Sequence, residues 1–75
     1  MSRTEQAECR GVLLRETDNA ILVAKDLSDE AEEFWFPRSQ IGYLKKTARP
    51  MGGTDITFTC PEWLVENKQA WGLVP

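Results

Sequence analysis

The densest group of reactive side chains in the sequence is a run of carboxylates. Five acidic residues fall between positions 26 and 33, namely Asp26, Asp29, Glu30, Glu32 and Glu33. Paired carboxylates can do acid–base catalysis when a protected cleft separates their pKa values. They can also bind Ca²⁺ when oxygen ligands are set at fixed spacing around a glycine. This run has neither that spacing nor a glycine, so it predicts a solvated acidic loop, with a partner-binding patch as the functional alternative.

A second charged group is basic. The sequence has no acidic residue from Phe34 to Thr54, and the cations there are interleaved with aromatic residues. Proteins bind single-stranded nucleic acid by attracting phosphates with cations and stacking bases on exposed aromatic rings. The candidate residues for such a surface are Arg38, Tyr43, Lys45, Lys46 and Arg49. The structural alternative places Trp35 in the core and uses the lysines to keep an edge strand soluble.

The other residue groups give only weak signals for catalysis or metal binding. The sequence contains no histidine, the commonest general base and metal ligand. Cys9 and Cys60 lack a C-x-x-C spacing, and we expect both to be reduced thiols in the core. Ser39 has no neighbouring base, so we expect it to cap a short turn, with Arg38 facing solvent. Because Gly52 and Gly53 precede a strand, they do not form a phosphate loop. We therefore predict no catalytic residue, no metal site and no cofactor.

Length and composition limit the class of protein. A chain of 75 residues forms one small domain with a thin core. Its 12 acidic and 9 basic residues give a net charge of −3, which argues mildly against general nucleic-acid binding. We find no apolar run long enough to cross a bilayer and no secretory leader. The prediction is a cytoplasmic domain without a membrane partner, and its oligomeric state stays open.

Strands are the main elements that position these groups. Residues 1–6 show no periodicity and are expected to fray. Apolar and β-branched runs predict strands at 7–17, 20–24, 34–36 and 42–46, with a turn at 17–19, a candidate bulge at Gly11 and a helical or 3₁₀ turn at 38–41. The clearest strand is 56–60, where Ile56, Phe58 and Cys60 alternate with threonines.

The C-terminal helical segment is expected at 61–72, with the helix itself running from about Pro61 to Trp71. Pro61 suits the first helical position, and apolar residues recur at helical spacing up to Trp71. Gly72 suits the residue after the helix. We expect Trp63 and Trp35 to lie in the core. Trp71 is either a lid on the sheet or an exposed contact for a partner.

These elements predict a mainly β fold (β-rich α+β). Because partial or full closure hides the edges of a small sheet, we expect a small bent antiparallel sheet or an SH3-like barrel of 4–5 strands with one C-terminal helix. A flat three-stranded sheet with a helix on one face is the alternative. Residues 1–75 then form a single domain, with the sheet at 7–60.

Two segments resemble motifs of short phage and prophage proteins. Residues 34–41, FWFPRSQI, match W-x-P-[KR]-S-Q-[IV], which in those proteins follows an aliphatic strand, here 20–23. Residues 61–64, PEWL, match P-x-W-[LI] at a helix start. The resemblance covers roughly residues 12–73 and implies this fold without catalytic residues. In size and charge the chain also resembles the accessory proteins with which phages disarm their hosts, anti-CRISPR proteins among them. The resemblance does not explain the length of the acidic run.

The leading functional hypothesis is a non-enzymatic, phage-type binding module in the cytoplasm of a bacterial host. Its acidic loop would steer it to a host protein with a basic groove, and apolar anchors such as Trp71 would add affinity. The alternative is an accessory protein that binds single-stranded nucleic acid through the basic and aromatic residues. An enzyme is disfavoured, because histidine and cofactor motifs are missing.

Overall fold

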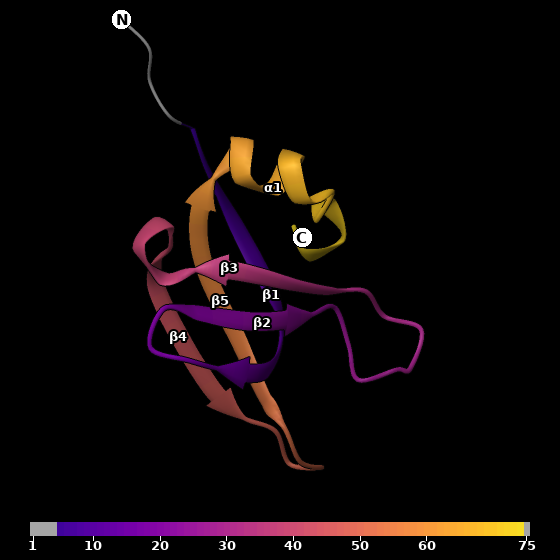
Figure 1. The fold of residues 1–75 in the computed structure, drawn as a ribbon. Coiled ribbons are helices and arrows are strands. Elements are labelled where there is room, and N and C mark those ends of the chain that lie inside the picture. The colour runs from indigo at the N-terminus through magenta and orange to yellow at the C-terminus, as the bar shows by residue number, and fades with distance from the viewer. Residues whose placement is uncertain (1–4, 75) are drawn as a thin grey trace, which may run out of the picture.

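Five antiparallel strands form one sheet in the computed structural model, which describes residues 5–74. The strands are β1 (Gln6–Glu16), β2 (Ala20–Ala24), β3 (Glu33–Pro37), β4 (Gly42–Ala48) and β5 (Thr54–Pro61). Their order across the sheet is β3-β2-β1-β5-β4. The other elements are the 3₁₀ turn η1 (Arg38–Gln40), the helix α1 (Glu62–Lys68) and the 3₁₀ turn η2 (Trp71–Leu73). Figure 1 shows α1 and η2 at one end of the sheet. The mainly β prediction with one C-terminal helix is confirmed.

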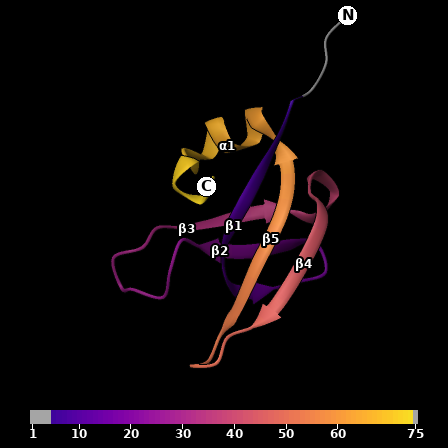
Figure 2. The ribbon, with the colours of Figure 1, turned by 180° about the vertical axis from the view of Figure 1, so that it is seen from behind.

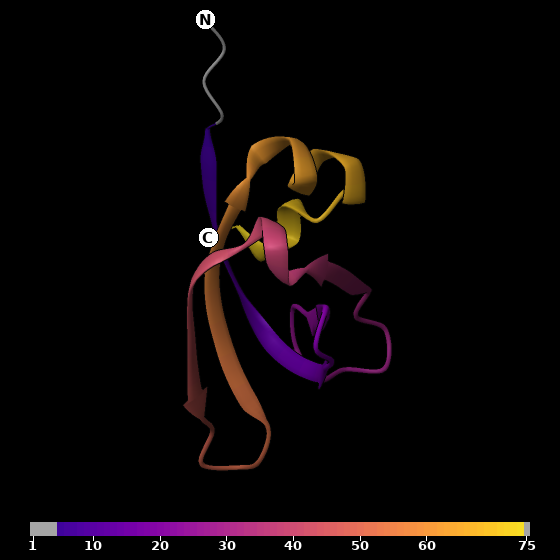
Figure 3. The same ribbon diagram turned by 60° about the vertical axis from the view of Figure 1, so that its left-hand side comes forward.

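The sheet bends sharply because β1 belongs to both of its halves. The first part of β1 pairs with β5 and its second part pairs with β2. Gly11 lies at the bend, where a Cβ atom would be 2.5 Å from the carbonyl oxygen of Ala24, so glycine is needed for this close approach. The bulge expected there lies instead between Leu13 and Arg15, where the register shifts. A layer of β1, β5 and β4 thus faces a layer of β2 and β3 (Figure 3), and the flat three-stranded alternative is wrong.

The core fills the inner side of this bend. Ile56, Phe58 and Cys60 of β5 are buried there, as their alternation predicted. The rings of Phe36 and Phe58 meet edge to face, with centroids 5.0 Å apart, an arrangement that aromatic pairs favour. The other large, fully buried side chains of the core come from β1, β2, α1 and η2, namely Cys9, Ile21, Val23, Val65 and Leu73.

The C-terminal helix is shorter than predicted. Gln69 adopts a left-handed conformation (φ 55°), and its N–H bonds to the carbonyls of Val65 and Glu66, which ends α1 at Lys68. Gln69 therefore caps the helix in place of Gly72, which lies inside the separate turn η2. The last turn of α1 also covers the core, because Lys68 Nζ lies 5.7 Å from the centre of the Phe36 ring.

Two tryptophans expected in the core lie at the surface. Trp35 and Trp63 expose 42% and 49% of their surface. Trp35 stands between two inward residues of a strand, so strand alternation turns it outward. On α1 the buried side is occupied by Leu64 and Val65, which leaves Trp63 facing solvent. Placing both tryptophans in the core was therefore wrong.

The chain just before residue 7 is more ordered than predicted. Gln6 pairs with Pro61 at the start of the β1–β5 ladder. The carbonyl oxygen of Glu5 accepts a hydrogen bond of 2.8 Å from the N–H of Glu62. These contacts tie the first described residues to the start of α1, whereas the rest of the expected frayed segment, residues 1–4, lies outside the described residues.

Candidate functional site

The acidic run forms the connection between β2 and β3, and residues 26–33 are called the acidic loop here. It projects beside the sheet in Figure 1. A turn at its start is local: Asp26 Oδ1 accepts a hydrogen bond of 2.9 Å from the N–H of Ser28, and the N–H of Ala31 donates to the carbonyl of Ser28. Hydrogen bonds from Ser28, chiefly from its side chain, lower the pKa of Asp26, which keeps this carboxylate charged.

The carboxylates of the acidic loop are exposed and unpaired. All five acidic residues predicted to bind a partner are exposed. Among residues 5–74 no Lys or Arg forms an ion pair with any of them. Their like charges therefore produce a negative potential that reaches into solvent, where it can act on a charged partner.

The acidic loop and the C-terminal turn meet around a hollow of about 300 Å³. Its walls combine Glu30 and Glu32 of the loop with Phe34 of β3 and Leu73 of η2. Trp71 does not line the hollow, although it belongs to the same turn. It is 45% exposed, and its Nε1–H donates a hydrogen bond of 3.2 Å to Glu66. Trp71 is therefore an exposed residue on the turn beside the hollow and not a lid on the core.

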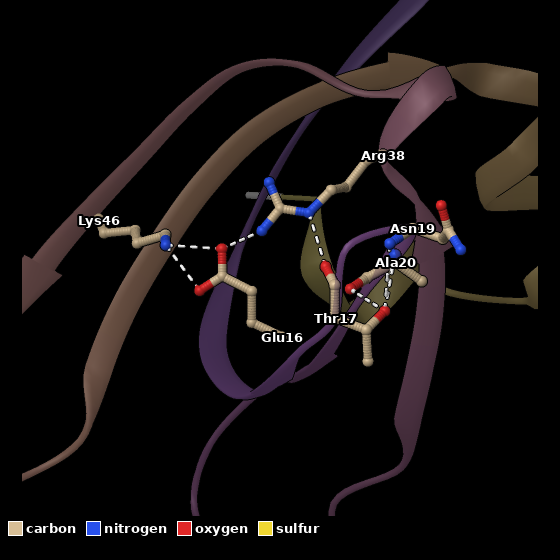
Figure 4. Close-up of polar contacts among 6 residues, drawn as sticks. All are labelled: Glu16, Thr17, Asn19, Ala20, Arg38 and Lys46. Carbon is tan, nitrogen blue, oxygen red and sulfur yellow. Dashed lines mark hydrogen bonds and ion pairs between the residues drawn. The ribbon is translucent and has the colours of Figure 1, made fainter.

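The predicted basic patch is divided by the fold. Arg38 and Lys46 both bind the carboxylate of Glu16, and these three residues are called the Glu16 cluster (Figure 4). Lys46 Nζ lies 2.7 Å from Oε1 and 2.8 Å from Oε2 of Glu16. Arg38 also donates from Nε to the carbonyl of Thr17 over 2.9 Å. Arg38 therefore does not simply face solvent as expected, and hydrogen bonds from Lys46 and then Arg38 lower the pKa of Glu16.

The Glu16 cluster has a structural position. It joins the end of β1 to η1 and β4, next to the tight turn at 17–19. In that turn Thr17 Oγ1 accepts a hydrogen bond of 3.0 Å from the N–H of Ala20 and donates to its carbonyl oxygen, which confirms the predicted turn (Figure 4). The cluster thus holds the β3–β4 connection against the β1–β2 hairpin.

The other members of the basic set differ among themselves. Arg49 Nε lies 3.7 Å from Oδ1 of Asp55, so its charge is partly compensated. Tyr43 and Lys45 are exposed. Lys45 is opposite Thr57 on β5, and Arg10 of β1 is opposite the same threonine, so both cations flank it on the outer face of the sheet.

Sequence reasoning missed Arg10. It lies far from the basic segment along the chain, and only the β1–β5 pairing brings it close to Lys45. A signal was present in the alternation of β1, because the inward residues Cys9 and Gly11 on either side turn Arg10 outward.

The two cysteines are packed side by side in the core. Cys9 and Cys60 are fully buried, with their sulfur atoms 3.8 Å apart, and neither forms a disulfide. Burial raises the pKa of Cys9 to about 12 and also raises the pKa of Cys60, so both remain protonated thiols at neutral pH. These are the reduced core thiols that the sequence predicted.

Ser39 lies inside the turn η1 and does not cap it. The turn η1 begins after Pro37 without a side-chain cap, so the capping role expected for Ser39 is not observed. In the part of the chain that the structure describes, no three Cys, Asp or Glu side chains are grouped as metal ligands. Every buried side-chain nitrogen or oxygen in that part has a hydrogen-bond partner. The exposed charged surfaces are thus the candidate sites.

Comparisons with known proteins found no match, so the site is interpreted from its own geometry. No family model matches the chain, and no curated protein or solved structure is significantly similar to it. Within residues 5–74, no helix has both the length and the apolar character needed to cross a membrane.

Proposed function

We propose that this protein is a non-enzymatic binding module of the phage accessory type, which occupies a basic surface of a host protein through its acidic loop. The observation that supports this proposal is the contrast between its two charged segments. The carboxylates of the acidic loop are exposed and unpaired among the described residues, whereas Arg38, Lys46 and Arg49 are matched by carboxylates of the same chain.

The proposed binding has an electrostatic step and an apolar step. Unpaired carboxylates attract a basic surface over several ångströms, which speeds association and selects partners of complementary charge. Phe34, half-buried in the wall of the hollow beside the loop, and the exposed ring of Trp71 then offer apolar contact area close to the charges. Aromatic and aliphatic anchors of this kind supply most of the affinity in protein interfaces. The host compartment would be the bacterial cytoplasm.

The alternative, a nucleic-acid-binding protein that uses all five basic and aromatic residues, has less support. A single surface would need Arg38 and Lys46 to give up their bonds to Glu16. Breaking such pairs to bind phosphate replaces one charged contact with another, so it adds little to the free energy of binding.

The proposal is tested with two variants that lose the same amount of negative charge at different places on the surface. One variant neutralises the acidic loop with Asp29→Asn, Glu30→Gln, Glu32→Gln and Glu33→Gln. A matched control removes the same charge from exposed carboxylates elsewhere, with Glu5→Gln, Glu8→Gln, Asp18→Asn and Glu62→Gln. Both variants are expected to fold, because surface substitutions change stability by about 0.5 kcal/mol or less each.

The measurement is capture of proteins from a bacterial lysate, followed by kinetics on the purified partner. We expect the wild type and the control to retain the same basic protein, and the loop variant to lose it. Association of the loop variant should be slower, and raised salt should slow the wild type to the same rate, because screening acts beyond about 8 Å. Equal capture by the loop variant would contradict the proposal.

A further inference from the structure

The outer face of the layer formed by β1, β5 and β4 carries a trough that the proposed function does not use. In Figure 2 these strands lie in front, and β2 and β3 pass behind β5. One groove lies between η1 and Tyr43, with Gln40 in its wall and a volume of about 500 Å³. A second, of about 580 Å³, lies between Tyr43 and Arg10. Both grooves share Tyr43 and Thr59, so they form one trough with the tyrosine between its halves.

Tyr43 projects into solvent from a bulge. The register of the β4–β5 pair shifts between Gly42 and Lys45, and within this bulge Tyr43 has a φ of 50°. A left-handed backbone is unfavourable for an aromatic residue, and bulges often redirect a side chain at a binding site. The ring is 90% exposed, so its burial does not offset this cost. Leu44, the next residue, packs against the core instead.

Two cations stand beside this ring on the same face. Lys45 and Arg10 both flank Thr57, one from β4 and one from β1. Within residues 5–74 neither forms an ion pair. Glu8 is the one carboxylate in the wall of this groove. Thr57, whose side chain is small, lies between the two cations, and both Lys45 and Arg10 are exposed.

We propose that this trough binds a short stretch of single-stranded nucleic acid. A base stacks on the exposed ring of Tyr43, and the neighbouring phosphates lie next to Lys45 and Arg10. A protruding aromatic ring with open space on both sides suits the flat faces of successive bases, and cations beside it suit the backbone. This surface shares only Tyr43 and Lys45 with the basic set found in the sequence, and it adds Arg10. It does not depend on the acidic loop.

The charge contribution is tested with two adjacent lysines that face opposite ways. Binding of a fluorescein-labelled oligothymidylate of about 12 nucleotides is followed by fluorescence anisotropy at low salt. We expect micromolar affinity for the wild type. Lys45→Ala should weaken binding and reduce the slope of log K against log salt by about 0.7, the value for one phosphate contact to a single strand. Lys46→Ala removes the same charge from the Glu16 cluster and should leave the slope unchanged.

The stacking contribution is tested at the bulge itself. Tyr43→Asn removes the ring but suits a left-handed backbone, so the fold is retained. It should weaken binding by about tenfold, while Tyr43→Phe, which keeps the ring, should bind like the wild type. Absence of binding at low salt would overturn the proposal, as would equal weakening by Lys45→Ala and Lys46→Ala. Displacement of the oligonucleotide by polyglutamate at equal charge concentration would also overturn it, in favour of an acidic peptide.

Discussion

The inner and outer faces of the β1–β5–β4 layer differ in the residues that each strand presents. On β5 the inner residues Ile56 and Phe58 are buried, whereas Thr57 between them lies on the outer face with partial exposure. On β4 the same alternation separates two identical side chains. Lys46 is opposite Ile56 and reaches Glu16, whereas Lys45 is opposite Thr57 and remains unpaired among the described residues. Residues of one type that are adjacent in a strand can therefore have different functions.

The contrast between the faces also explains why the basic segment and the acidic loop differ. In the basic segment Lys45 and Lys46 lie on β4 and therefore on opposite faces, and Lys46 and Arg49 meet carboxylates of β1 and β5. In the acidic loop only Glu33, the first residue of β3, is part of a strand ladder, and the exposed charges of the loop stay together in solvent. A charge run on a loop is thus a better guide to a surface patch than one on a strand.

The largest expected effect distinguishes neighbours on the two faces of β5. Phe58→Ala removes a fully buried ring that contacts Phe36, and we expect it to destabilise the fold by about 3–5 kcal/mol. Thr57→Ala on the outer face should change stability by about 0.5 kcal/mol or less. Denaturation by urea measures both. A cost for Thr57→Ala close to that for Phe58→Ala would show that the outer face is also a packed core.

A smaller effect is expected when a polar group is placed on the inner face. Cys60→Ser places a hydroxyl where a sulfur atom packs and should destabilise by about 1–3 kcal/mol. In the wild type, a thiol reagent should label Cys9 and Cys60 slowly until denaturant is added, because burial keeps both thiols protonated. Rapid labelling in native buffer would contradict the assignment of both residues to the core.

The smallest effect concerns pH and the Glu16 cluster. The pKa of Glu16 is lower in the folded state than its usual value of 4.5, because Lys46 and Arg38 donate hydrogen bonds to it. A carboxyl of this kind stabilises the fold above its unfolded pKa, and the contribution is lost as the pH falls through the folded pKa. Glu16→Gln should therefore lower the melting temperature at neutral pH and have progressively less effect in acid.

Two lysine variants control this experiment. Lys46→Ala should lower the melting temperature in the same pH range as Glu16→Gln, and the double variant should add little to either change. Lys45→Ala, on the outer face, should leave the melting temperature nearly unchanged. A pH-independent effect of Glu16→Gln would mean that its packing matters and its charge does not.

Local patterns in the sequence were sufficient for the strands and turns. The period of two in β5 identified its buried residues, and Thr17 with its neighbours identified the first hairpin turn. These features depend on contacts between residues a few positions apart, which the sequence displays directly. The same reasoning located the acidic loop and classed both cysteines as core thiols.

The tertiary structure decided where each charge and each tryptophan lies. Glu16 meets Arg38 and Lys46 only because the bend of β1 brings three elements together. Trp63 faces solvent because Leu64 and Val65 fill the limited space over the sheet. Strand pairing joins residues that are distant along the chain, and its register sets which side chains share a face. A single sequence shows the alternation within each strand, but the partner and register of that strand follow from the packing of the whole sheet.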